Sequence, residues 1–67
     1  MVNSDLIMER MKAAGVDQTY VSEKMKVAQS TLSLKINNHR AFTIEEMFKL
    51  SEILDIPGSD LHKFFLV

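Results

Sequence analysis

The sequence predicts a compact all-α domain of five helices. Three observations support this prediction: apolar residues recur at helical spacing, capping residues stand where the helices would start, and the connections are only two to six residues long. The 67 residues are enough for a single domain, 1–67, and the 46% content of hydrophobic residues is enough for one core.

The first two helices have clear boundaries. One is expected from about Ser4 to Ala14, with Gly15 as its C-terminal stop. The next opens at Asp17, a good N-cap, and ends near Met25.

The third and fourth helices are separated by a turn. The third is expected at about 29–37, and Asn38 then takes a left-handed conformation, which Asn tolerates better than most residues. The fourth has the best-marked start, because Thr43 and Glu46 form a capping box, and it stops before Pro57.

The last helix is expected after Ser59 and ends with two adjacent aromatic residues, Phe64 and Phe65. Residues next to each other on a helix point in different directions, so a helix cannot turn both rings fully inward. We therefore expect one ring to close the core and the other to be left for a partner. A weak homodimer through this helix follows as a hypothesis.

Charge is distributed unevenly along the chain. The net charge is −1, but residues 24–44 contain four Lys or Arg residues and no acid, whereas the flanks hold all nine acids. A protein that approaches a phosphate backbone needs positive potential only where it touches the duplex. The basic window also holds Gln29, Ser30, Thr31 and Ser33, small hydrogen-bonding residues that are unusual for an ordinary solvent-exposed face.

The link between the second and third helices is the feature most informative about function. Only Lys26, Val27 and Ala28 separate them, and so short a link forces the steep crossing of a helix-turn-helix. In that motif the second helix can lie in the major groove of DNA.

A resemblance to a known family lies in two segments, QTYVSEKMKVAQSTL at 18–32 and KINNHRAFT at 35–43. They resemble the lambda-repressor-like family, which includes Cro and the phage repressors, and the likeness extends over about residues 5–66. The resemblance implies sequence-specific binding of double-stranded DNA by a small bacterial or phage repressor. It also implies a dimer on a pseudo-palindromic operator, with recognition helices about 34 Å apart.

Base-reading residues are expected on one face of the third helix. Their spacing places them together, and a carboxamide can bond adenine N7 and N6 at once. The expected residues are Gln29, Ser30, Ser33, Leu34 and Asn37. The resemblance further implies that Gln18 braces Gln29 against a phosphate.

Phosphate contacts are expected from the basic window and from the start of the second helix. The residues are Gln18, Lys24, Lys26, Lys35, His39 and Arg40. Lys35 falls where relatives often have an apolar residue, so a slight rotation of the third helix would bring it and Leu34 nearer the DNA.

The sequence departs from the family pattern at several positions. Lys26 stands where glycine is usual, so the chain must take a costly left-handed conformation or a different turn. Ala28 replaces a capping Ser or Thr, forgoing about 1 kcal/mol. Met11 and Ile36 replace a buried Arg–Glu pair, and we expect them to meet in the core.

Two other functions are compatible with the sequence. A protein-interaction module of the same fold, antitoxin-like or antirepressor-like, is kept as an alternative because DNA-binding domains are usually basic. A purely structural domain is the second alternative. We expect no enzymatic activity, no cofactor, no metal and a cytoplasmic location, because the chain has no cysteine, two distant histidines and no signal peptide. A chain that starts at Met1 and ends soon after the fifth helix suggests a free-standing Cro-like protein.

Overall fold

The computed structural model describes residues 1–66 and contains the five predicted helices. They are α1 (Ser4–Ala14), α2 (Gln18–Met25), α3 (Gln29–Ile36), α4 (Ile44–Leu54) and α5 (Leu61–Phe65). A single 3₁₀ turn, η1 (Gly58–Asp60), precedes α5, so the last α-helix begins at Leu61, one residue later than a start directly after Ser59. The described residues contain no strand, as predicted.

The helix ends follow the capping residues. Asn3, which the sequence analysis did not single out, caps α1 by accepting from the Leu6 N–H, and Asp17 caps α2 by accepting from the Tyr20 N–H. Thr43 and Glu46 form the complete capping box expected at α4. Ala28 makes no capping hydrogen bond at α3, as predicted.

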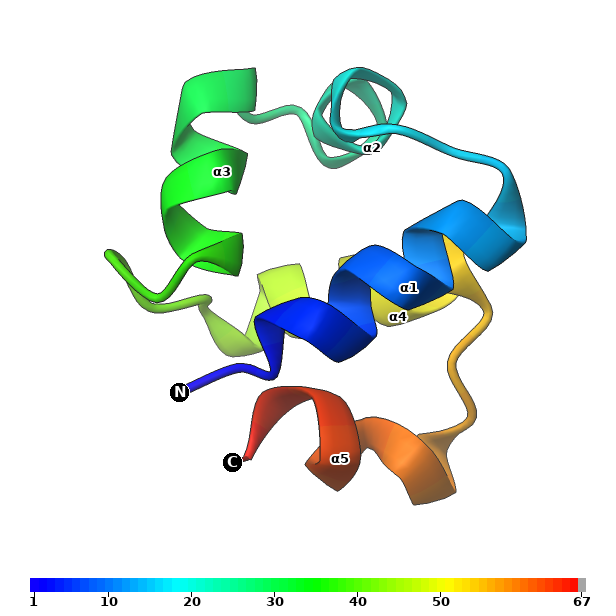
Figure 1. Cartoon of the computed structure of the whole chain (residues 1–67). Coiled ribbons are helices and arrows are strands. Elements are labelled where there is room, and N and C mark those ends of the chain that lie inside the picture. Colours follow the sequence, from blue (N-terminus) through cyan, green and yellow to red (C-terminus); the bar gives the residue numbers. More distant parts are fainter. Residues whose placement is uncertain (67) are drawn as a thin grey trace.

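The helices pack in an orthogonal bundle around one core. Figure 1 shows α1 crossing in front of α4, with α2 and α3 above this pair and α5 below it. Six fully buried side chains form the centre: Ile7, Val21, Leu32, Ile36, Leu50 and Leu54. The bundle measures 27 × 24 × 20 Å.

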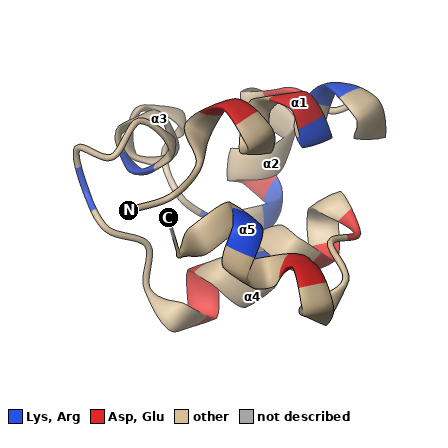
Figure 2. Cartoon of the chain, turned by 60° about the horizontal axis from the view of Figure 1, so that its bottom comes forward, with Lys and Arg blue, Asp and Glu red and all other residues tan. Residues whose placement is uncertain are grey.

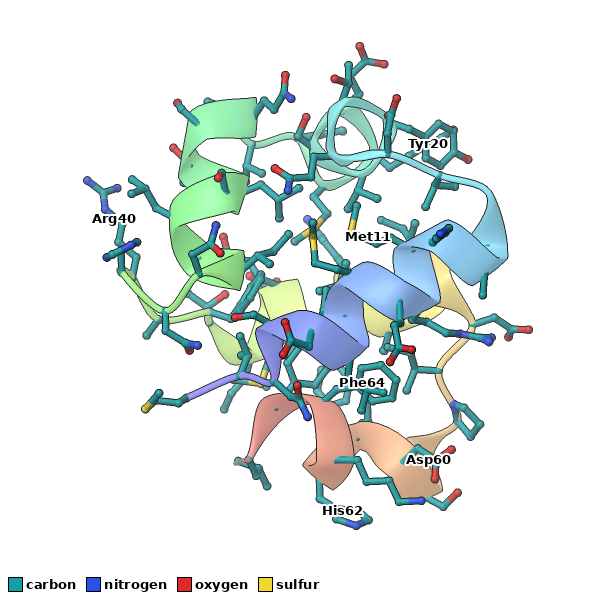
Figure 3. All side chains as sticks on the ribbon, in the orientation of Figure 1. Met11, Tyr20, Arg40, Asp60, His62 and Phe64 are labelled. Atoms are coloured by element: carbon teal, nitrogen blue, oxygen red, sulfur yellow. The ribbon has the colours of Figure 1, made fainter. Side chains whose placement is uncertain are left out.

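Met11 and Ile36 are both buried in this core, and their direct contact stays a prediction. Figure 3 shows Met11 in the interior of the bundle. Both positions are thus apolar, and within residues 1–66 no buried side-chain nitrogen or oxygen lacks a hydrogen-bond partner.

The expectation for the last helix is wrong, because both aromatic rings are buried: Phe64 is 7% exposed and Phe65 is 4% exposed. α5 is only one turn long and is covered on two sides. Phe64 lies between α5 and α1 (Figure 3), while the ring of Phe65 packs edge-on against Phe42, with centroids 6.0 Å apart. Neither ring is left for a partner.

In residues 1–66 the longest helices have 11 residues, and none is long and apolar enough to cross a membrane.

Candidate nucleic-acid interface

α2 and α3 form the helix-turn-helix. Ser22 is buried at 3% exposure in α2, and its hydroxyl donates to the Thr19 carbonyl at 2.9 Å, so its polar atom needs no other partner. A side chain this small lets α3 cross closely. The sequence left open whether Lys26 takes a left-handed conformation or the link forms a different turn. In the structure Lys26 is left-handed, with φ of 59°.

The outer face of α3 and its C-cap, Asn37, carry the five predicted base-reading residues. Gln29, Ser30, Leu34 and Asn37 are exposed, and Ser33 is half-buried. In residues 1–66 the Gln29 carboxamide has no hydrogen-bond partner, so its donor and acceptor are both available. The role of this face in reading bases stays a prediction.

The side-chain amide of Asn37 already makes hydrogen bonds within the protein. Its amide nitrogen donates to the Ser33 carbonyl at 2.9 Å and approaches the Ser33 hydroxyl at 3.4 Å. Neither of these two contacts uses the side-chain carbonyl oxygen of Asn37.

Gln18 lies at the start of α2, and the brace against a phosphate that the resemblance implied for Gln18 and Gln29 stays a prediction. Its amide donates to the sulfur of Met8 in α1 at 3.8 Å, and no hydrogen bond joins the two glutamines within residues 1–66. A thioether is a weak acceptor, so little free energy holds Gln18 in this position.

Lys35 is the clearest correction to the predicted phosphate contacts. Its ammonium pairs with both carboxylate oxygens of Glu46 in α4, and its side chain is only 12% exposed. α3 is therefore not rotated to present Lys35 to DNA. The positive charge is neutralised inside the protein, where it ties the end of α3 to the start of α4.

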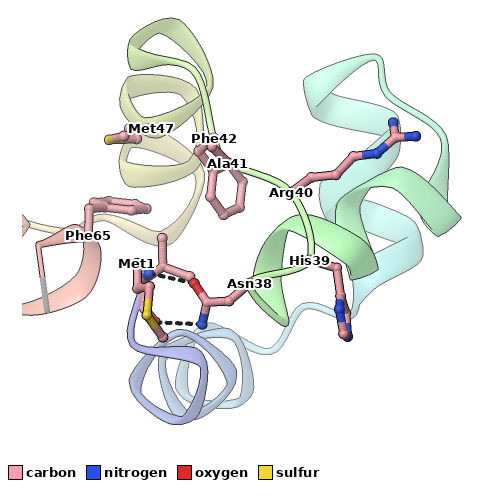
Figure 4. A pocket seen from close by; sticks show the side chains of 9 residues that line it. Met1, Asn38, His39, Arg40, Ala41, Phe42, Met47 and Phe65 are labelled. Atoms are coloured by element: carbon pink, nitrogen blue, oxygen red, sulfur yellow. Dashed lines mark hydrogen bonds between the residues drawn. The ribbon is translucent and has the colours of Figure 1, made fainter.

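The other predicted cations are exposed, and they fall into two groups. His39 and Arg40 lie in the turn after α3, as Figure 4 shows, and Figure 2 shows a basic position in the loop that leads from α3 to α4. Lys24 and Lys26 instead line a hollow of about 360 Å³ with Lys49, a residue of α4 that the sequence analysis did not select.

The Lys24 group lies away from the α3 surface. The Lys24 ammonium lies 5.5 Å from the centroid of the Tyr20 ring. Figure 3 shows Tyr20 on the side of α2 opposite α3. Lys24 is therefore badly placed to act together with Arg40.

Asn38 positions the turn that carries His39 and Arg40. It adopts a left-handed conformation with φ of 65°, as predicted. Its carboxamide accepts from the Val2 N–H at 2.7 Å and donates to the Val2 carbonyl at 3.0 Å (Figure 4). The hydroxyl of Ser4 also donates to the Ile36 carbonyl, so the N-terminal segment is bound to the end of α3. Spacing along the chain gave no sign of these contacts.

Comparison with known proteins assigns the arrangement to a family. A family model described as "Helix-turn-helix", of the Cro type, matches residues 7–61. No curated protein and no solved structure gives a significant match.

Proposed function

Because the chain belongs to the lambda-repressor-like helix-turn-helix family of DNA-binding transcription regulators, we propose that it is a sequence-specific repressor of the bacterial or phage Cro type. It would occupy an operator with α3 in the major groove and exclude RNA polymerase. The observation that carries this proposal is the outer face of α3, which presents exposed hydrogen-bonding groups at the start of the helix.

Gln29 is the principal base-reading residue in this proposal. It is the first residue of α3, and its carboxamide has both hydrogen-bonding groups free, as bidentate contact with adenine requires. Ser30 lies beside it, and the partly exposed Leu34 offers an apolar surface for a thymine methyl group.

The ends of the two helices supply the phosphate contacts. Ala28 provides no side-chain acceptor, so the first N–H groups of α3 remain free to bind an anion. Arg40 and His39 stand at the other end of α3, in the turn held by Asn38. Gln18 joins this set once it releases the weak contact with Met8.

The salt dependence of duplex binding tests the proposal. Each phosphate neutralised by a cation adds about 0.9 to the slope of log affinity against log salt. We expect Arg40→Ala to weaken binding to all sequences and to reduce the slope by about 1. The matched control is Lys63→Ala on α5, which removes the same charge far from α3 and should leave the slope unchanged.

The same titration separates the alternative function. A protein-interaction module would show no duplex binding even at low salt, or binding that is equal for wild type and Arg40→Ala. Either result would contradict the proposed repressor.

A further inference from the structure

Met8 places an oxidisable sulfur atom next to Gln18, a member of the proposed phosphate-binding set. The Sδ atom of Met8 accepts a hydrogen bond from the side-chain Nε2 of Gln18 at 3.8 Å. A thioether is a weak acceptor, so this contact breaks easily when Gln18 turns towards a phosphate. A change that turns Met8 into a strong acceptor would therefore compete with DNA for the same amide.

Solvent has access to the side chain of Met8. The residue is 48% exposed, and together with Gln18 it lines a hollow of about 640 Å³ between α1 and the start of α2. Met11 and Met25, by contrast, are only 4% and 3% exposed. A dissolved oxidant must reach the sulfur atom to react with it, so Met8 is a site of oxidation and the two buried methionines are protected.

The charges around this hollow favour an uncharged oxidant. The carboxylates of Asp5, Glu9 and Asp17 line the hollow, against the single ammonium of Lys12. The excess of negative charge repels an anion. Hydrogen peroxide carries no charge at neutral pH, so it is the oxidant that suits this site.

We propose that Met8 is a site of reversible oxidation that controls the contact of Gln18 with DNA. In the reaction a lone pair of Sδ attacks one oxygen of hydrogen peroxide, so an S–O bond forms as the O–O bond breaks. The other peroxide oxygen leaves as hydroxide and takes the proton of the transferred oxygen, which gives water. The sulfur is oxidised by two electrons to the sulfoxide, and the peroxide is reduced.

Oxidation strengthens the contact between Met8 and Gln18. The S–O bond places negative charge on oxygen, so the sulfoxide is a better acceptor than the thioether. An oxygen added on the side of Gln18 closes the separation of 3.8 Å to an ordinary hydrogen bond of about 2.9 Å. Gln18 must break this bond before it reaches a phosphate, which lowers DNA affinity about three- to tenfold. This effect rests on the proposed function, in which Gln18 contacts the duplex.

Binding to a mixed-sequence DNA duplex at low salt tests the effect, because phosphate contacts need no operator. Wild type, Met8→Leu and Gln18→Ala are each measured before and after treatment with hydrogen peroxide, and mass spectrometry locates the added oxygen. We expect oxidised wild type to bind about three- to tenfold more weakly, and Met8→Leu to bind equally well before and after treatment. Gln18→Ala should bind more weakly from the start and lose nothing further on oxidation.

Met1 is an internal control in this experiment. At 81% exposure it is oxidised in all three proteins, so an effect of its oxidation appears in Met8→Leu as well. Methionine sulfoxide reductase should restore the affinity of the oxidised wild type. An oxidised wild type that keeps its affinity would overturn the proposal, as would an equal loss in Met8→Leu or Gln18→Ala.

The side-chain amide of Gln18 provides a readout that does not depend on DNA. The other glutamine of the chain, Gln29, is a matched control, because its carboxamide makes no hydrogen bond within residues 1–66. In nitrogen–proton NMR spectra, oxidation should shift the amide protons of the Gln18 side chain downfield and leave those of Gln29 unchanged.

The two measurements separate this proposal from the proposed function. If the reduced wild type binds no duplex at low salt, the proposed function fails, and the NMR spectrum still tests the bond between oxidised Met8 and Gln18. If the reduced protein binds DNA but the Gln18 amide does not shift after complete oxidation of Met8, the proposed function stands and the inference about Met8 is wrong.

Discussion

Glu46 combines a capping hydrogen bond with an ion pair at the edge of the candidate interface. Its carboxylate accepts from the Thr43 N–H at 2.8 Å, which completes the capping box of α4, and pairs with the ammonium of Lys35 in α3. Burial by itself raises the pKa of Glu46. The hydrogen bonds from Lys35 and Thr43, together with the charge of Lys35, outweigh burial and hold the pKa below its ordinary value of 4.5.

This lowered pKa predicts how stability depends on pH. A carboxylate whose pKa is lower in the folded state stabilises the fold above its unfolded pKa, and the effect is lost as the pH falls through the folded pKa. We expect Glu46→Gln to reduce the free energy of unfolding at pH 7 by about 1–3 kcal/mol. The difference from wild type should shrink as the pH falls below 4.5.

Urea unfolding at several pH values measures this difference, with Glu45→Gln as the control. Glu45 is exposed beside Glu46 and makes no hydrogen bond through its side chain within residues 1–66. A Glu46→Gln deficit that stays constant from pH 7 to pH 3 would show that the carboxylate is not stabilised by its charge.

At the residue scale, the capping box could be predicted from the sequence, whereas the ion pair between two helices could not. Thr43 and Glu46 are three positions apart, so their box can be read from the sequence. Lys35 and Glu46 are 11 positions apart and meet only because α3 and α4 cross, so Lys35 looked like one more cation for DNA. Side chains that act across elements, such as Asn38 on Val2, were missed for the same reason.

The link between α2 and α3 is the strained element of the helix-turn-helix. Lys26 occupies the left-handed region, which disfavours a residue with a Cβ atom. We expect Lys26→Gly to stabilise the domain by about 0.5–1 kcal/mol, after allowing for the greater entropy of glycine in the unfolded chain.

Thermal or urea unfolding measures this effect, and Lys24→Gly is the matched control. Lys24 is within α2, so the same change should destabilise the domain by about 1 kcal/mol. A loss of stability in Lys26→Gly would show that the side chain of Lys26 contributes more than its backbone costs.

The C-terminal end of α4 receives hydrogen bonds from another helix, α1. α4 has no basic residue in its last turn, but Arg10 of α1 donates from Nε to the Leu54 carbonyl at 2.8 Å and from Nη2 to the Asp55 carbonyl at 3.0 Å. Charge-assisted bonds to the negative end of a helix dipole stabilise both elements.

Arg10→Ala should therefore lower the free energy of unfolding by about 1–2 kcal/mol. Lys12→Ala on the same helix removes an equal charge from the surface and should change it by less than about 0.5 kcal/mol. Equal effects of the two substitutions in denaturant titrations would mean that Arg10 acts only through net charge.

At the scale of the whole molecule, the sequence predicted the five helices and the helix-turn-helix because both depend on local periodicity, caps and link length. Which apolar side chains are exposed on the surface depends on how the helices pack, and this was predicted less well. α5 is short and lies against both α1 and the Phe42 side of the bundle, so it buries two adjacent rings and leaves the exposed apolar surface to α4. Three of the five predicted base-reading residues, Gln29, Ser30 and Leu34, are exposed on α3, where the helical period places them on one side, and Asn37 is exposed at its C-cap.

The cations that are close together in residues 24–44 of the sequence lie at separate places in the structure. Of the cations in the basic window, Lys35 is neutralised by Glu46, and Lys24 and Lys26 gather near Lys49. Arg40 is left as the strongest cation near the end of α3. The proposed DNA affinity thus rests on few charges, which makes the base contacts of α3 decisive.

Selection from a random pool of duplex DNA, run in parallel with wild type and Gln29→Ala, tests the central claim most directly. We expect the wild type to enrich a palindromic motif, and the variant to lose an A·T preference at one position in each half, worth about 1–3 kcal/mol of discrimination. No enrichment at low salt, or the same motif from both proteins, would contradict sequence reading by Gln29 at the start of α3.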